Sequence, residues 1–183
     1  MNRSKESVYD QLLVLRCQKG DTQALEELVE RWEPRLFYYV RRLVEQEADA
    51  WDVLQKTWLK VMRGISQLRD AQSLAAWMYT LARRTAIDHG RQRWDNHLSL
   101  TALDMTDEPS NETDPTLSFE NAEAVHSALE RLSMPHREVL TLFFLQDLSI
   151  DQIADVIGVP AGTVKSRLYY ARRALGKAMG AED

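Results

Sequence analysis

The chain has 183 residues, 44% of them hydrophobic, and a formal net charge of −5, which suffices for one globular domain or two small ones. No apolar run approaches the roughly 20 residues of a membrane span, and the first residues are polar and charged, so we predict no membrane span or signal peptide and expect a cytoplasmic protein. The single cysteine, Cys17, excludes an internal disulfide and offers no metal-ligand cluster.

Residues 1–94 have the periodicity of a small helical bundle. Apolar residues at helical spacing predict helices over 8–18, between Asp21 and Val44, over 49–65 and over 73–94. Pro34 predicts a kink or break in the second helix. We expect residues 65–72 to form a loop and Ser73 to cap the fourth helix. Core candidates of the third helix are Val53, Leu54, Trp58, Val61 and Met62.

The composition changes between residues 95 and 121. This segment has seven acidic residues and no Lys or Arg, together with Pro109, Pro115 and many Ser, Thr and Asn. It has no lasting apolar period, which is typical of a flexible, acidic linker. Two small domains are therefore predicted, over 1–94 and 122–183, with the linker 95–121 between them.

Helical periodicity returns in residues 122–183. Two short helices are predicted on either side of Ser133 and Pro135, and a helix-turn-helix follows from Ser149. Ser149 and Gln152 have the spacing of a capping box, Gly158 can end the first helix with positive φ, and Pro160 suits the first turn of the next. Val164, Leu168, Ala171 and Leu175 form the buried stripe of that second helix. No strand is expected, so the fold class is all-α.

The second helix of this motif has charge of one sign. Five basic residues and no acidic one lie between Ala161 and Met179. A plain helical hairpin with solubilising charges is the alternative, but clustered Lys and Arg favour neutralisation of DNA phosphates by a helix in the major groove. The polar positions of this helix are Thr163, Lys165, Ser166, Arg167, Tyr169, Tyr170, Arg172 and Arg173.

Two features of residues 1–94 also suggest binding. The helix over 73–94 combines aromatic residues with arginines, as in proteins that hold single-stranded nucleic acid, although Trp77 is in phase with the apolar positions and its spacing favours the core. Asp49 and Asp52 share a helix face and no cleft partner is evident. A solvated face or a docking contact is therefore favoured over a catalytic pair.

Sequence motifs for catalysis are missing. The chain has no phosphate-cradling glycine loop, HExxH, CxxC or GxSxG, and its four histidines are scattered. We therefore predict a protein that is not an enzyme and needs no metal or cofactor.

Three segments resemble bacterial sigma factors, particularly the small extracytoplasmic-function (ECF) group of the sigma-70 family. GVPAGTVKSRLYYARRAL is similar to their region 4, DAWDVLQKTWLKVMRGI to region 2.2, and SLAAWMYTLARRTAIDHGRQR to regions 2.3 and 2.4. The resemblance covers roughly residues 22–94 and 122–179. Trp51 and Lys56 stand where the family usually has glutamates, and Tyr170 stands where arginine is common, so the upstream base preference is expected to be unusual.

The resemblance implies a function and its sites. A region 2-like bundle and a region 4-like helix-turn-helix would bind core RNA polymerase, through the β′ clamp helices and the β flap, and would recognise promoter DNA and help to open it. Asp49, Asp52 and Gln55 would contact core polymerase. Arg83, Arg84, Asp88 and Arg91 would face the −10 element, and the loop 65–72 would hold a flipped base. The polar positions of the second helix (Thr163, Lys165, Ser166, Arg167, Tyr169, Tyr170, Arg172 and Arg173) would face the −35 element, with Lys165, Ser166, Tyr169 and Arg172 on its exposed side. Many relatives are held by an anti-sigma factor.

Two other function classes stay open at this point. A stand-alone helix-turn-helix regulator would need a ligand pocket or dimer seam in residues 1–94, and neither is evident. A helical adaptor with no DNA role leaves the acid-free segment from Ala161 to Met179 unexplained. Binding to core polymerase would distinguish a sigma factor from the regulator and from the adaptor.

Overall fold

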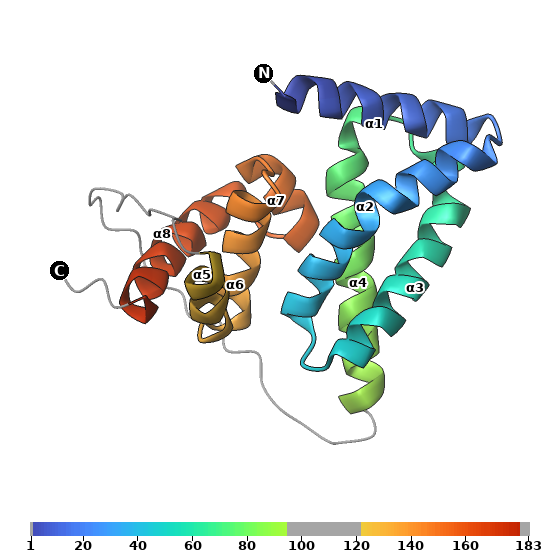
Figure 1. The fold of residues 1–183 in the computed structure, drawn as a ribbon. Coiled ribbons are helices and arrows are strands. Elements are labelled where there is room, and N and C mark those ends of the chain that lie inside the picture. Colours follow the sequence, from blue (N-terminus) through green and yellow to red (C-terminus); the bar gives the residue numbers. More distant parts are fainter. Residues whose placement is uncertain (1, 95–121, 180–183) are drawn as a thin grey trace. The chain divides into compact units, whose positions relative to one another are not determined.

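The computed structural model describes residues 2–94 and 122–179, and it separates into two compact units, Met1–Arg93 and Trp94–Asp183 (Figure 1). Helices and short helical turns make up both units, and no strand occurs in the described ranges. The all-α prediction is confirmed. The predicted linker, 95–121, lies outside the described residues.

The first unit is a helical bundle (Figure 1). Its elements are α1 (Asn2–Gln18), α2 (Thr22–Leu43), α3 (Glu47–Gly64), the 3-10 turns η1 (Ile65–Gln67) and η2 (Ala71–Ser73), and α4 (Leu74–Trp94). α2 packs against α1 and α3, and α1 also contacts η1 and η2. α1 begins earlier than its apolar pattern indicated.

Pro34 does not break α2. A proline inside a helix removes one backbone hydrogen bond and destabilises the helix by about 3 kcal/mol. α2 nevertheless runs from Thr22 to Leu43, with Trp32, Leu36 and Tyr39 buried on both sides of the proline. Burial of three large side chains outweighs the local penalty, at roughly 1.5–3 kcal/mol each, so of the predicted kink or break, the break does not occur.

Aromatic rings connect α2 to α4. The Tyr79 ring of α4 meets Trp32 and Tyr39 of α2 edge to face, with centroid separations of 5.9 and 5.1 Å. All three side chains are buried. Trp32 Nε1 donates to Asp10 Oδ1 at 3.4 Å, and the same oxygen accepts from Arg31 Nε at 2.6 Å. The aromatic core thus also fixes α1 against α2.

Some apolar side chains of this unit face outward. Met62, a predicted core residue of α3, is 48% exposed, and Leu12 and Leu15 of α1 are also exposed. Val53, Leu54, Trp58 and Val61 are buried as expected. The period of an amphipathic helix fixes the centre of its buried stripe, whereas the stripe's edges depend on the neighbouring helix.

The segment between α3 and α4 is more ordered than the predicted loop. Gln18 Nε2 donates to the carbonyl oxygens of Ile65 and Leu68, at 3.2 and 2.8 Å, and thereby fixes this segment to the end of α1. The expected cap also differs. Asp70 Oδ1 accepts from the Gln72 backbone N–H at 2.9 Å, while the Ser73 hydroxyl donates to the Asp70 carbonyl.

The second unit contains the predicted helix-turn-helix. Its elements are α5 (Ala122–Glu130), α6 (Met134–Leu140), the π-helical turn η3 (Thr141–Leu145), α7 (Ile150–Ile157) and α8 (Ala161–Ala178). α8 packs against α5, α6 and α7. The predicted stripe of Val164, Leu168, Ala171 and Leu175 is buried in full.

The turn chemistry of the motif is confirmed at both ends of α7. The Ser149 hydroxyl accepts from the Gln152 N–H, and the Gln152 side chain accepts from the Ser149 N–H, which completes the capping box. Gly158 ends the helix at φ +71°. Pro160 is the N-cap residue of α8, one position before the first turn that was predicted for it.

Gly158→Ala is expected to destabilise the second unit by about 1 kcal/mol, because a Cβ disfavours the left-handed conformation. A Cβ at Gly158 would meet no atom within 4 Å, so the penalty is one of backbone conformation alone. Gly176, inside α8, has equal space and an ordinary helical φ. Gly176→Ala should therefore stabilise the unit by up to about 1 kcal/mol. Thermal unfolding followed by circular dichroism compares the two, and changes of the same sign would contradict this account.

Candidate nucleic-acid interface

The side of α8 opposite its buried stripe has the charge expected of a DNA-binding helix. Lys165, Arg173 and Lys177 are exposed, and no acidic residue occurs between Ala161 and Met179. The capped end of α7 and the glycine turn position the first turns of α8 next to α7. A helix held in this way can place its N-terminal turns in a major groove.

Two polar side chains near the start of α8 are half-buried. The Ser166 hydroxyl donates to the Thr163 carbonyl at 3.0 Å, and the Thr163 N–H donates to the Pro160 carbonyl at 2.9 Å. Ser166 therefore already has a partner within its own helix. Lys165, between them, is exposed.

Tyr169 contacts both Tyr170 and Arg173. The two tyrosine rings meet edge to face at 5.3 Å, and the Arg173 guanidinium lies 5.8 Å from the Tyr169 ring centroid. Arg173 Nη1 also donates to the Tyr169 hydroxyl at 3.4 Å. An exposed arginine thus orients a half-buried tyrosine.

Arg172 is half-buried, like Ser166 and Tyr169, and its side chain contacts a neighbouring element. Its guanidinium lies 5.6 Å from the Phe143 ring centroid and 5.0 Å from that of Phe144. Both rings belong to η3, where a π-helical turn interrupts the regular helix. Arg172 therefore connects α8 to η3 by cation–π contacts, and sequence spacing alone could not reveal those rings.

Arg167 is half-buried and faces α6. Burial lowers the pKa of the His136 imidazole on α6, and the positive charge of Arg167 lowers that pKa further. A neutral His136 avoids repulsion with the arginine. Arg167 consequently has a partner element within its own unit as well as its predicted DNA role.

The α4 residues assigned to the −10 element form a mostly exposed surface. Arg84, Asp88 and Arg91 are exposed at helical spacing, whereas Arg83 is half-buried. Asp88 Oδ2 lies 3.6 Å from Lys60 Nζ of α3. Trp77 is half-buried and lies outside the buried core, and its ring comes within 2.9 Å of where a Cβ on Gly64 would be. The ring therefore packs against the end of α3, at the edge of the core that was predicted for it.

The α3 residues assigned to polymerase docking divide into two kinds. Asp52 and Gln55 are exposed. Asp49 is not, because its Oδ1 lies 3.2 Å from His89 Nε2 of α4 and its side chain is 15% exposed. The prediction that Asp49 lacks a partner inside its own domain is wrong. The structure assigns Asp49 to the α3–α4 contact.

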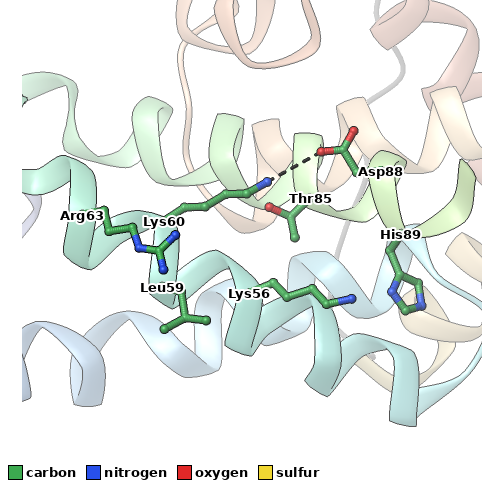
Figure 2. Close-up of a pocket in the computed structure, with 7 residues that line it drawn as sticks. All are labelled: Lys56, Leu59, Lys60, Arg63, Thr85, Asp88 and His89. Atoms are coloured by element: carbon green, nitrogen blue, oxygen red, sulfur yellow. Dashed lines mark ion pairs between the residues drawn. The ribbon is translucent and has the colours of Figure 1, made fainter. Parts of the chain in front are cut away.

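A hollow of about 340 Å³ between α3 and α4 was missed by sequence reasoning (Figure 2). Its lining residues are Lys56, Leu59, Lys60, Arg63, Thr85, Asp88 and His89. The three cations are spaced i, i+4 and i+7, which places them on one side of α3. This spacing is the feature of the sequence from which the cationic side of α3 could have been predicted.

Other site types have no support in the described ranges. No group of three or more His, Cys, Asp or Glu side chains there could hold a metal ion. None of the described helices has the length and apolarity to cross a bilayer.

Comparison with known proteins agrees with this geometry. The model of sigma-70 region 2 matches residues 28–95, and that of sigma-70 region 4 matches residues 122–175. The chain is 33% identical over 181 residues to the RNA polymerase sigma-H factor of Pseudomonas aeruginosa, covering 93% of each protein. It is 32% identical over 180 residues to the ECF RNA polymerase sigma-E factor of Escherichia coli K12, covering 93% of this chain and 94% of that protein.

Two solved structures share the fold. CnrH, solved in complex with the cytosolic domain of CnrY, has a TM-score of 0.66 at 22% identity and covers 96% of this chain and 99% of that one. The sigma factor RpoE of Bartonella quintana, solved with the anti-sigma factor NepR, has a TM-score of 0.67 at 21% identity, with 86% and 98% covered.

Proposed function

The chain belongs to the extracytoplasmic-function group of the sigma-70 family, and on that premise we propose which of its residues bind RNA polymerase and promoter DNA. A sigma factor binds core RNA polymerase, recognises the −35 and −10 promoter elements and promotes DNA melting. The observation that supports this function is the match of sigma region 2 and sigma region 4 to this chain, in that order. The alignment with the sigma-H factor covers 93% of the chain. We further propose that the protein acts by binding, without catalysis of its own, and in the cytoplasm.

We assign −35 recognition to α8. Its exposed Lys165 is proposed to contact base edges, and Arg173 is proposed to contact phosphates. Thr163, Ser166, Arg167, Tyr169 and Tyr170 complete the assigned surface. Arg172 acts indirectly in this proposal, since its cation–π contacts with η3 position α8.

We assign −10 recognition and melting to α4 and the turns before it. Arg83, Arg84, Asp88 and Arg91 make up the proposed α4 surface, and residues 65–72 are proposed to hold a flipped base. Extruding a base from the stack requires a few kcal/mol, which binding to the protein must repay. The Gln18 contacts that fix the 65–72 segment support this role, because a preformed loop loses less entropy when it binds.

Three protein partners follow from the same proposal. Asp52 and Gln55 on α3 would contact the β′ clamp helices, and the second unit would contact the β flap. An anti-sigma factor is the third partner, since RpoE of Bartonella quintana was solved with one.

Reconstitution with core polymerase tests the function. Added to core enzyme, the chain should give transcription from a subset of sequences in a promoter library, which core enzyme alone does not transcribe. A stand-alone regulator would instead bind its DNA equally well without core enzyme and would confer no promoter-dependent transcription.

Asp52→Arg should weaken binding to core polymerase by roughly tenfold or more, because charge reversal places like charges together at the proposed contact. Asp52 is exposed, so the free energy of unfolding should change by less than about 0.5 kcal/mol. Glu26→Arg is the matched control, as Glu26 is an exposed acidic residue of α2. Titration of labelled protein with core enzyme measures both variants, and equal affinities would remove Asp52 from the docking surface.

A further inference from the structure

The side-chain amide of Gln18 connects the end of α1 to the segment between α3 and α4. Gln18 is half-buried, and its NH2 group has two donors. Both donors are used, because Gln18 Nε2 donates to the carbonyl oxygen of Ile65 at 3.2 Å and to that of Leu68 at 2.8 Å. A side chain 47 and 50 residues away in sequence thus fixes two backbone carbonyls of the 65–72 segment.

The rest of this segment is fixed by its own hydrogen bonds. The Leu68 N–H donates to the Ile65 carbonyl at 3.2 Å, which closes the turn η1. The Asp70 side chain accepts from a backbone N–H of η2 at 2.9 Å and caps that turn. Arg69, between the two turns, is exposed. Gln18 therefore holds the first turn and Asp70 the second, and the exposed part of the segment is left free to meet a ligand.

The end of α1 that bears Gln18 is itself attached to α2. Arg16 Nε lies 2.8 Å from Asp21 Oδ2, and Arg16 Nη1 lies 3.1 Å from Glu27 Oε1 of α2. Gly20 has a φ of +83°, which allows the chain to turn sharply after α1. The backbone of Gln18 is therefore supported, and its side chain reaches the 65–72 segment from a fixed position.

We propose that Gln18 is a positioning residue for base recognition by the 65–72 segment. Its two hydrogen bonds hold the segment's backbone in the shape that accepts the extruded base of the −10 element. The inference rests on the proposed role of this segment and adds a residue of α1 that acts through the segment's backbone. A site that must be ordered when its ligand binds loses affinity for the correct ligand. Loss of the Gln18 amide should therefore lower discrimination at the extruded base more than it lowers binding of the strand as a whole.

A role of Gln18 in stability alone is the competing explanation. A smaller folded fraction would weaken the binding of every DNA probe by the same factor. A displaced backbone would instead act only at the base that the segment holds. The ratio of affinities for a probe with that base and a probe without it separates the two explanations, because the folded fraction cancels in the ratio.

Omission of single bases measures this ratio. Holoenzyme is bound to fork probes from a promoter that the wild-type holoenzyme transcribes, with the non-template strand single-stranded through the −10 element. One probe is complete, and each of the others has one abasic position. Gln18→Met keeps the length of the side chain and removes both hydrogen bonds. It should reduce the ratio at one or two positions by about tenfold, or about 1.4 kcal/mol, the size expected for two neutral hydrogen bonds. The ratios at the other positions should not change.

Gln11→Met is the matched control, because Gln11 is a half-buried glutamine of α1 whose side chain donates to Ser7 Oγ of the same helix at 3.3 Å. It should leave every ratio unchanged. Gln18→Glu should reduce the ratio at least as far as Gln18→Met, because its carboxylate only accepts hydrogen bonds and would face two carbonyl oxygens. In the free protein, the Leu68 amide should exchange its hydrogen faster in both Gln18 variants, since its turn opens more readily.

The outcomes separate this inference from the proposed role of the segment. Unchanged ratios in the Gln18→Met holoenzyme, with the wild-type ratios above one, would overturn the inference and leave the role of the segment standing. Weaker binding of all probes by one common factor would also overturn it, as would an unchanged exchange rate of the Leu68 amide. Failure of the segment's proposed role would appear in the wild-type holoenzyme, as equal affinities for the complete and the abasic probes.

Discussion

Leu168→Ala is expected to lower the free energy of unfolding of the second unit by about 2–5 kcal/mol. Leu168 is 4% exposed at the centre of the buried stripe of α8, and α8 packs against α5, α6 and α7. A unit of about 60 residues is marginally stable, with only a few kcal/mol between the folded and unfolded states. The variant should therefore lose much of the folded second unit at growth temperature, and with it transcription that depends on the −35 element.

The tryptophans separate this effect from a general loss of structure. Four of the five, Trp32, Trp51, Trp58 and Trp77, lie within Met1–Arg93, so tryptophan fluorescence mainly follows the first unit, whereas circular dichroism follows both. In Leu168→Ala, part of the helical signal should be lost at lower temperature while the fluorescence transition stays in place. Leu145→Ala is the control, because Leu145 is 36% exposed. A shifted fluorescence transition in Leu168→Ala would show that the two units unfold together.

Local features of the second unit could be predicted from sequence because neighbours in the chain determine them. The capping box joins residues three apart, and the buried stripe of α8 follows from 3.6 residues per turn. The left-handed Gly158 follows from the absence of a Cβ. Each of these features requires knowledge of one helix only.

The features that sequence analysis missed are contacts between elements. It found no partner for Asp49, because that partner, His89, lies 40 residues away on α4. It did not predict the cation–π contacts of Arg172, because helical spacing does not reveal the rings of η3. The hollow between α3 and α4 depends likewise on how these two helices pack. A helical period indicates which face is polar, and tertiary packing decides which polar residues remain free to bind a partner.

Lys165→Ala is expected to change which −35 sequences the holoenzyme prefers, whereas Arg173→Ala should weaken binding to all sequences alike. Lys165 is exposed in the second turn of α8, the part of a recognition helix that reaches base edges. Loss of a base contact should weaken binding by about 1–3 kcal/mol at particular positions. Arg173 lies two turns further on, where phosphates are nearer, and its loss should lower the salt slope by about one unit.

The contact between Arg173 and Tyr169 calls for one further variant. Arg173 donates to the Tyr169 hydroxyl at 3.4 Å, so Arg173→Ala also releases the tyrosine. Tyr169→Phe removes that hydrogen bond and keeps the ring and the Arg173 charge. Binding of holoenzymes to a library of −35 sequences at two salt concentrations measures all three variants. If Tyr169→Phe changes the ranking of sequences, Arg173 contributes to specificity by orienting Tyr169. An unchanged ranking in Lys165→Ala would mean that α8 does not read bases through Lys165, even in a functional sigma factor.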